Sequence, residues 1–147
     1  MANYAENRKA RFDYEILEKY ETGIELLGTE VKSVRGGRMS LEGAFVIVRG
    51  GEAYIINANI PPYQASNSPS SYDPLRNRKL LLTKKEIAEL GGSEKNKSLT
   101  IVPLSVYNKG TKIKVSIALV KGKKQFDKRE TTKKRETDRD IRRTLKN

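Results

Sequence analysis

The last twenty-seven residues, 121–147, constrain most strongly what this chain can fold into, because they carry charge and almost no material for a core. They hold twelve of the thirty Lys and Arg residues and five acids, so their net charge is +7, against +5 for residues 1–120. Their only large apolar side chains are Phe126, Ile141 and Leu145. Burying all three would contribute roughly 6–9 kcal/mol, whereas ordering twenty-seven residues costs on the order of 30–50 kcal/mol. The sequence therefore predicts a tail that is disordered when free.

Local patterns indicate what this tail becomes when a partner holds it. Acid-before-base pairs at i,i+4 spacing and a stripe formed by Ile141 and Leu145 favour a helix from about Thr131 onward. Phe126 stands among the cations of residues 122–129, where an aromatic ring can stack on a base while its neighbours hold phosphates. A solvated basic tail is the alternative. We favour a segment that orders against a polyanion, because counterion release supplies the free energy that a core would otherwise supply.

Composition narrows the partner and the chemistry. The net charge of +12 and the pI near 9.9 indicate an acidic partner, either nucleic acid or an anionic membrane surface. The membrane is disfavoured, since no apolar run approaches the length of a span. The chain has no Cys and no His, which removes the commonest catalytic base, thiolate chemistry and the commonest transition-metal ligands. We therefore expect no enzyme, no cofactor and no metal, and a cytoplasmic protein without a secretory signal.

Residues 1–120 read as one compact domain of short strands. Residues 1–11 form a polar arm expected to be loosely ordered, as a frayed terminus or as an RNA-contacting arm. From Phe12 to Glu21 polar and apolar residues alternate, which predicts a strand, and Thr22-Gly23 permits a bulge or turn. Two hairpins are predicted, 44–48 with 53–56 and 98–107 with 112–120. This pattern predicts a mostly β fold, a small antiparallel OB-like barrel with short helices and a basic C-terminal tail.

Two short helices and one long loop complete the predicted body. Residues 29–35 favour a helix with Thr29 as its cap. Residues 84–90 favour a second helix, opened by a capping box of Thr83 and Glu86 and closed by Gly91-Gly92. The proline-rich stretch 57–78 reads as a surface loop.

Individual side chains give weaker signals. Carboxylates such as Glu21 and Glu30 are expected in ordinary surface salt bridges rather than in acid–base catalysis. Aromatic residues in strands are more often core than stacking platforms, and this expectation covers Phe12, Tyr14, Tyr20 and Tyr63.

Several motifs lie in order along nearly the whole chain, at residues 7–11 (NRKAR), 20–24 (YETGI), 28–33 (GTEVKS), 78–82 (RKLLL), 102–104 (VPL) and 122–129 (GKKQFDKR). Together these motifs resemble those of the SmpB family of SsrA-binding proteins. The resemblance implies an OB-like barrel, residues 1–120, that binds transfer-messenger RNA (tmRNA, SsrA RNA). It also implies delivery of that RNA to ribosomes stalled on messages without a stop codon, followed by tagging of the nascent peptide in trans-translation. The sequence departs from the family at Phe12, commonly His, and at Phe126, commonly His or Tyr.

The resemblance also implies site residues. Glu21 would accept hydrogen bonds from RNA or orient a cation, and Leu81 would pack against a sugar or base. The tail, residues 121–147, would occupy the empty message channel of the small ribosomal subunit, at the decoding centre, as a helix. The expected tmRNA contacts are Asn7, Arg8, Lys9, Arg11, Tyr14, Glu21, Lys32, Arg35, Arg78, Lys79 and Leu81. The expected ribosome contacts are Lys123, Lys124, Phe126, Asp127, Lys128, Arg129, Lys133, Lys134 and Arg135.

A second function fits the same composition. A ribosomal protein or ribosome-assembly factor could also combine an OB-like barrel with a basic tail, in that case as a permanent part of the particle. Stoichiometric presence in idle ribosomes would identify it. In either case we expect a monomer with RNA as its partner.

Overall fold

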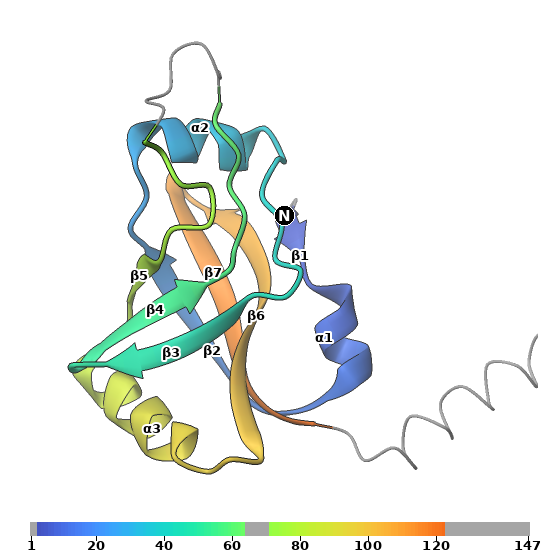
Figure 1. Ribbon diagram of the computed structural model, residues 1–147, viewed down its shortest axis with the longest axis vertical. Coiled ribbons are helices and arrows are strands. Elements are labelled where there is room, and N and C mark those ends of the chain that lie inside the picture. Colours follow the sequence, from blue (N-terminus) through green and yellow to red (C-terminus); the bar gives the residue numbers. More distant parts are fainter. Residues whose placement is uncertain (1–2, 64–70, 123–147) are drawn as a thin grey trace, which may run out of the picture.

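Seven antiparallel strands form a sheet that closes into a ring. The computed structural model describes residues 3–63 and 71–122 (Figure 1). Neighbouring strands follow the order β6-β3-β4-β5-β2-β7, and β7 pairs back onto β6 to close the barrel, while β1 adds to β6 from outside. The prediction of a small antiparallel barrel is confirmed. The strands are β1 (Asn3–Glu6), β2 (Tyr14–Ile24), β3 (Phe45–Arg49), β4 (Glu52–Ile56), β5 (Arg78–Leu81), β6 (Leu99–Lys109) and β7 (Lys112–Gly122).

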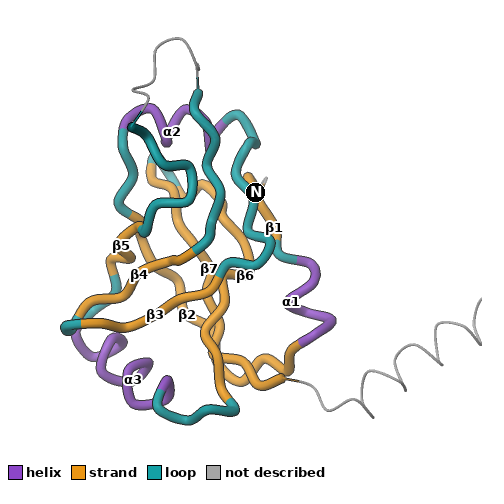
Figure 2. The backbone as a smooth tube through the Cα atoms, viewed as in Figure 1, coloured by secondary structure: helices purple, strands orange, loops and turns teal. Residues whose placement is uncertain are grey.

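Three short helices cover the barrel from outside. Figure 2 shows α1 (Arg8–Asp13) beside the β6–β7 hairpin, α2 (Gly28–Arg35) across one end, and α3 (Lys84–Glu94) under β3. Along the chain, each helix connects two consecutive strands. None of the helices within residues 3–63 and 71–122 is long and apolar enough to cross a membrane.

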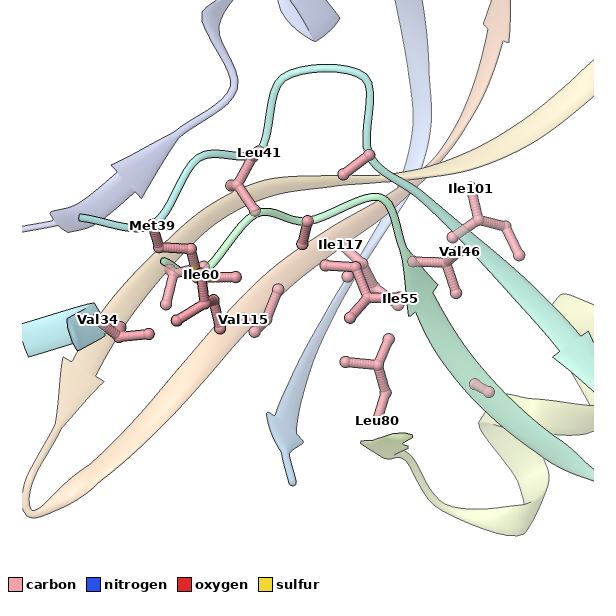
Figure 3. Packing of buried hydrophobic residues seen from close by; sticks show 14 of the residues in the cluster. Val34, Met39, Leu41, Val46, Ile55, Ile60, Leu80, Ile101, Val115 and Ile117 are labelled. Atoms are coloured by element: carbon pink, nitrogen blue, oxygen red, sulfur yellow. The ribbon is translucent and has the colours of Figure 1, made fainter. Parts of the chain in front are cut away.

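The core fills the inside of the ring. Branched aliphatic side chains from most of the strands, together with Val34 of α2 and Leu90 of α3, are almost completely buried there. Ile55 and Ile117 have no exposed surface, and both are labelled within the cluster in Figure 3. The helices therefore contribute to the same core as the sheet, which fixes α2 against the end of the barrel.

Both predicted hairpins are present, with strands close to the predicted bounds. The β3–β4 turn uses Gly50 and Gly51, both at positive φ (59° and 75°), a conformation that glycine adopts without steric cost. In the β6–β7 hairpin, β7 continues to Gly122, two residues beyond the predicted Val120, because Lys121 and Gly122 pair with the start of β2.

The prediction of a loosely ordered arm at residues 1–11 is wrong for residues 3–11, the part of the arm that the structure describes. Residues Asn3–Glu6 pair with β6, and α1 then packs Ala10 onto Val102 and Val120, on the outer face of the β6–β7 hairpin. This hairpin is therefore covered on both faces, by the core of the barrel on one and by α1 on the other. The packing links residues about a hundred positions apart, and the polar composition of the arm gives no sign of it.

The bulge or turn predicted at Thr22-Gly23 is also absent. Strand β2 begins at Tyr14, since Phe12 belongs to α1, and it runs unbroken through Gly23, which pairs with Lys114. The irregularity lies instead between Ile16 and Glu18, where the register with β7 shifts by one residue.

The helix ends differ in part from prediction. The Thr83 capping box is confirmed: Thr83 accepts from the amide of Glu86 at 3.2 Å, and Glu86 accepts from the amide of Thr83 at 3.0 Å. However, α3 continues through Gly91-Gly92 to Glu94, because the Glu94 carboxylate accepts from the amide of Val48 at 2.7 Å and pairs with Arg49. In α2 the cap is Leu27, not Thr29.

Replacing Thr83 by Ala is expected to lower the free energy of unfolding by about 1 kcal/mol, because the amide of Glu86 loses its acceptor. The matched control is Thr29→Ala, which removes a threonine from the first turn of α2 without removing a cap. Urea denaturation of both variants measures the difference. Equal losses in the two variants would show that the hydroxyl of Thr83 has no special role.

Candidate functional site

Glu21 stands near the end of β2 with two partners from the neighbouring hairpin. The Tyr107 hydroxyl donates to one carboxylate oxygen of Glu21, and the Lys109 ammonium lies 2.9 Å from the other. These hydrogen bonds, the Tyr107 one first, lower the pKa of Glu21 below its usual value. Burial and then the Glu21 hydrogen bond raise the pKa of Tyr107 to about 12. Glu21 is thus an ionised, oriented acceptor that is still 40% exposed.

Leu81, at the end of β5, is an exposed apolar side chain next to β2, the strand that carries Glu21. It is 54% exposed and lies opposite Gly23 of β2. A Cβ at Gly23 would lie 3.2 Å from the Cδ1 atom of Leu81, so the absence of a side chain there makes room for Leu81. The pairing holds Leu81 at the surface on a strand rather than on a loop.

A groove of about 360 Å³ lies next to Leu81. Its walls are apolar, formed by Ile24, Leu26, Val31 and Ile113, and none of the described residues that line it is acidic. Its remaining lining residues are Gly23, Arg35, Leu81, Thr111, Lys112 and Lys114. An apolar floor with a cationic rim suits a sugar or base attached to phosphates.

Arg35 is the residue that α2 contributes to the cationic rim of the groove. Its guanidinium donates to the carbonyl of Thr111 at 3.0 Å, which ties α2 to the turn between β6 and β7. The structure thus brings together three of the predicted site residues, Glu21, Arg35 and Leu81, at one end of the barrel.

A second group of predicted residues lies at the other end of β2. Asn7, Lys9 and Tyr14 line a hollow of about 290 Å³ between α1 and the barrel. Tyr14 and Glu21 are seven positions apart along the strand, a span of about 23 Å. These two groups of predicted tmRNA contacts therefore lie in separate regions.

Both polar atoms of the Asn7 side chain make hydrogen bonds within the protein. Its side-chain oxygen accepts from the amide of Ala10 at 3.2 Å, which caps α1, and its amide nitrogen donates to the carbonyl of Pro103 at 3.0 Å. Arg8 is almost fully exposed and pairs loosely with Glu6 at 3.6 Å, and Arg11 lies within α1.

Arg78 does not belong to the surface at all. It is fully buried and donates to Glu30, at 2.7 Å, and to the carbonyls of Ala58 and Pro74 at 2.8 and 3.0 Å. An RNA cannot reach this side chain, so the prediction of an RNA contact at Arg78 is corrected to a structural role.

Glu30 is the centre of this buried network, and the prediction of a surface salt bridge for it is wrong. Its carboxylate accepts from Arg76, from Arg78, from the Tyr72 hydroxyl at 3.0 Å and from the amide of Leu27 at 2.8 Å. Burial alone would raise its pKa, but these hydrogen bonds outweigh burial and lower the pKa to about 2. The network joins α2 to the proline-rich loop and β5.

The remaining predicted cations lie away from the groove. Lys79, on β5, pairs with Glu52 of β4 at 2.6 Å, and this hydrogen bond raises its pKa. Lys32 projects from α2 with its ammonium 5.7 Å from the centre of the Tyr63 ring. The predicted ribosome contacts from Lys123 to Arg135 lie outside the described residues.

Sequence reasoning missed four residues around Glu21 and Leu81. They are Tyr107, Lys109, Lys112 and Lys114, all from the β6–β7 hairpin. No pattern in the sequence indicated that β7 pairs with β2, which places Lys112 and Lys114 at the end of β2 that carries Glu21. The described residues contain no group of three or more acids that could hold a metal ion.

Comparisons with known proteins point to one family. The family model described as "SmpB protein" matches residues 4–147. An SsrA-binding protein of Gloeothece citriformis is 55% identical over 141 residues, 96% of this chain and 91% of the relative. An SsrA-binding protein of Enterococcus faecalis is 54% identical over 143 residues, 97% and 92% of the two chains.

A solved structure also resembles the fold. It is described as "tmRNA-SmpB: a journey to the center of the bacterial ribosome" and matches with a TM-score of 0.68 at 50% identity. The match covers 82% of this chain and 84% of the other.

Proposed function

We propose that this chain, which belongs to the SmpB protein family, binds tmRNA and delivers it to stalled bacterial ribosomes as an adaptor of trans-translation. The observation that carries the proposal is the surface formed by Glu21, Leu81 and the cation-rimmed groove. An exposed leucine held on a strand beside an ionised carboxylate has no role in this barrel's core. Both groups suit contact with a folded RNA.

The chemistry of this surface divides into three parts. Leu81 and the apolar floor take the face of an unstacked base or a sugar. Glu21 accepts hydrogen bonds from base amines or a 2′-hydroxyl, because Tyr107 and Lys109 fix its orientation. Arg35, Lys112 and Lys114 neutralise phosphates without reading sequence.

Leu81→Ala is expected to weaken binding of the tRNA-like domain of tmRNA by about tenfold, the size of one lost stacking or packing contact. The barrel should remain folded, because Leu81 is already largely exposed. Fluorescence anisotropy with labelled RNA measures the affinity, and thermal unfolding checks the fold. The control is Leu75→Ala, which removes an equally exposed leucine from the proline-rich loop. If Leu81→Ala lost stability and affinity together, the side chain would be a structural one.

We further propose that the barrel and the tail divide the work. The barrel, predicted as residues 1–120 and now with β7 extending to Gly122, holds tmRNA, and the segment that follows occupies the empty message channel. The net charge of the tail favours a channel lined by ribosomal RNA. We expect the protein to act in the cytoplasm, where it meets ribosomes.

We also propose that the protein has no catalytic activity of its own. The chain contains neither His nor Cys, and the predicted chemistry is recognition. Incubating labelled tmRNA with the protein, with and without Mg²⁺, should leave the RNA intact over hours. Cleavage that depends on Mg²⁺ and on the protein would show an enzyme instead.

A further inference from the structure

An exposed tyrosine stands among cations where the proline-rich loop meets α2. The Tyr63 side chain is 39% exposed, and the Lys32 ammonium lies 5.7 Å from the centre of its ring. Neither residue lines the groove beside Leu81. On α2 it is Val31 and Arg35 that face the groove, whereas Lys32 lies over Tyr63. Tyr63 therefore belongs to a surface separate from the one described above.

The backbone that carries Tyr63 is held by α2 and the residues after it. The Ser33 hydroxyl donates to the carbonyl of Pro61 at 2.7 Å. The Arg38 guanidinium donates to the carbonyls of Pro62 and Tyr63 at 3.4 and 3.1 Å. These bonds fix three successive carbonyls, so the ring is presented from an ordered backbone and a partner does not have to order it.

The loop is fixed just before these residues as well. The Tyr72 hydroxyl donates to the carbonyl of Ile60 at 2.7 Å and to Glu30 at 3.0 Å. Since Glu30 and Ile60 are themselves buried, this contact ties the loop to the core. The Tyr63 ring is therefore presented, partly exposed, from a backbone that is tied to the core.

The charge around the ring identifies the kind of partner. Along residues 27–38 the exposed charged side chains are Lys32, Arg35 and Arg38, and all are cations. The one acid in this stretch, Glu30, is buried and paired with Arg76 and Arg78. An aromatic ring beside the cations of residues 27–38 suits a nucleotide, whose base stacks while its phosphates meet the cations.

We propose that Tyr63 is a stacking platform for an unpaired RNA base, with Lys32 and Arg38 holding the adjoining phosphates. The base comes either from tmRNA or from ribosomal RNA, and the chemistry of the contact is the same. The proposal rests on the proposed function, in that the partner is RNA, and adds a second contact on another side of α2.

The chain contains no tryptophan, which allows a direct test. In the full chain, Tyr63→Trp places a single indole on the proposed platform. Two probes are titrated, the tRNA-like domain of tmRNA and small ribosomal subunits without message. Stacking predicts quenching of the indole emission by at least one of them, and the probe that quenches identifies the source of the base. The control is Tyr54→Trp on β4, whose emission should not change.

Affinity gives a second readout. With the probe that quenches, Tyr63→Ala should weaken binding between about fivefold and a hundredfold, whereas Tyr63→Phe, which keeps the ring, should stay within about twofold. Lys32→Gln should lower the slope of log affinity against log salt by about one, and Lys85→Gln, on the exposed first turn of α3, should not.

Two results would refute the proposed stacking platform, and they differ in whether the proposed function fails with it. Unchanged indole emission with both probes, although labelled RNA is bound, refutes stacking at Tyr63 while the tmRNA role stands. If the wild-type chain binds neither probe, both proposals fail together.

Discussion

Glu30→Gln is expected to lower the free energy of unfolding by about 3–5 kcal/mol, because it leaves the buried charge of Arg78 without its carboxylate. Arg78 and Glu30 both have fully buried side chains, with nitrogen and oxygen 2.6 Å apart. Domains of this size are stable by only about 5–15 kcal/mol in total. Urea denaturation measures the loss. The matched control, Glu42→Gln, changes an exposed carboxylate and should cost less than about 0.5 kcal/mol.

A double variant separates the lost pair from the unpaired charge. Arg78→Met combined with Glu30→Gln should be more stable than Glu30→Gln alone, since no buried cation remains to be satisfied by that carboxylate. Arg78→Met is also measured alone. If the double variant lost as much stability as Glu30→Gln and Arg78→Met lose together, the charge of Arg78 would not be the cause of the destabilisation.

The same network predicts a pH dependence. The folded-state pKa of Glu30, about 2, lies below its ordinary value of 4.5, so the native state favours the ionised form. The stability that Glu30 contributes is therefore fully present above about pH 4.5 and is lost as the pH falls towards 2. The stability difference between the wild type and Glu30→Gln should shrink over this range. A difference that stays constant from pH 6 to pH 3 would contradict the assignment.

Removing all residues after Gly122 is expected to abolish peptide tagging while the affinity for tmRNA changes less than about tenfold at physiological salt. The barrel ends with Gly122 in its last strand, so the truncation leaves every described contact in place. What it removes is the segment whose phosphate contacts would be made on the ribosome. Tagging is measured in a bacterial extract that lacks its own SsrA-binding protein and translates a message without a stop codon.

A scrambled tail serves as the matched control for charge. It keeps the composition of residues 123–147 but loses the i,i+4 pairs and the Ile141–Leu145 stripe. We expect it to bind ribosomes and to fail in tagging. Normal tagging by the truncated chain would refute the division of work between barrel and tail.

The parts of the fold that sequence predicts well are those set by neighbouring residues. The hairpin turn at Gly50-Gly51 and the Thr83 capping box depend on a few adjacent side chains, and both are present as predicted. The closure of the ring is different, because β2 pairs with β5 and with β7, strands far away in sequence. Its register depends on the packing of the whole core.

Arg78 illustrates a misleading local signal. Residues 57–78 read as a surface loop and Arg78 as an RNA contact, yet β5 alternates, so Arg78 and Leu80 point inward while Lys79 and Leu81 point outward. What the sequence could not supply is the buried partner, since Glu30 lies forty-eight positions away on α2.

The candidate site also combines residues that were predicted from the sequence with a placement that was not. Glu21 and Leu81 were predicted from a family resemblance, and the structure adds the reason that they lie at the same end of the barrel. Gly23 pairs with Leu81 on one side of β2 and with Lys114 on the other, which brings the cations of β7 to the same end of the barrel. No local pattern in the sequence links these three strands.

Recovery of RNA bound to this chain tests the central claim most directly. The full chain is expressed with an affinity tag in bacteria, isolated at physiological salt, and the retained RNA is sequenced. A tmRNA adaptor predicts strong enrichment of tmRNA over its share of cellular RNA, and loss of that enrichment in Leu81→Ala. Ribosomal RNA retained in proportion to ribosomes, with no excess of tmRNA, would contradict the account and identify a permanent ribosomal component instead.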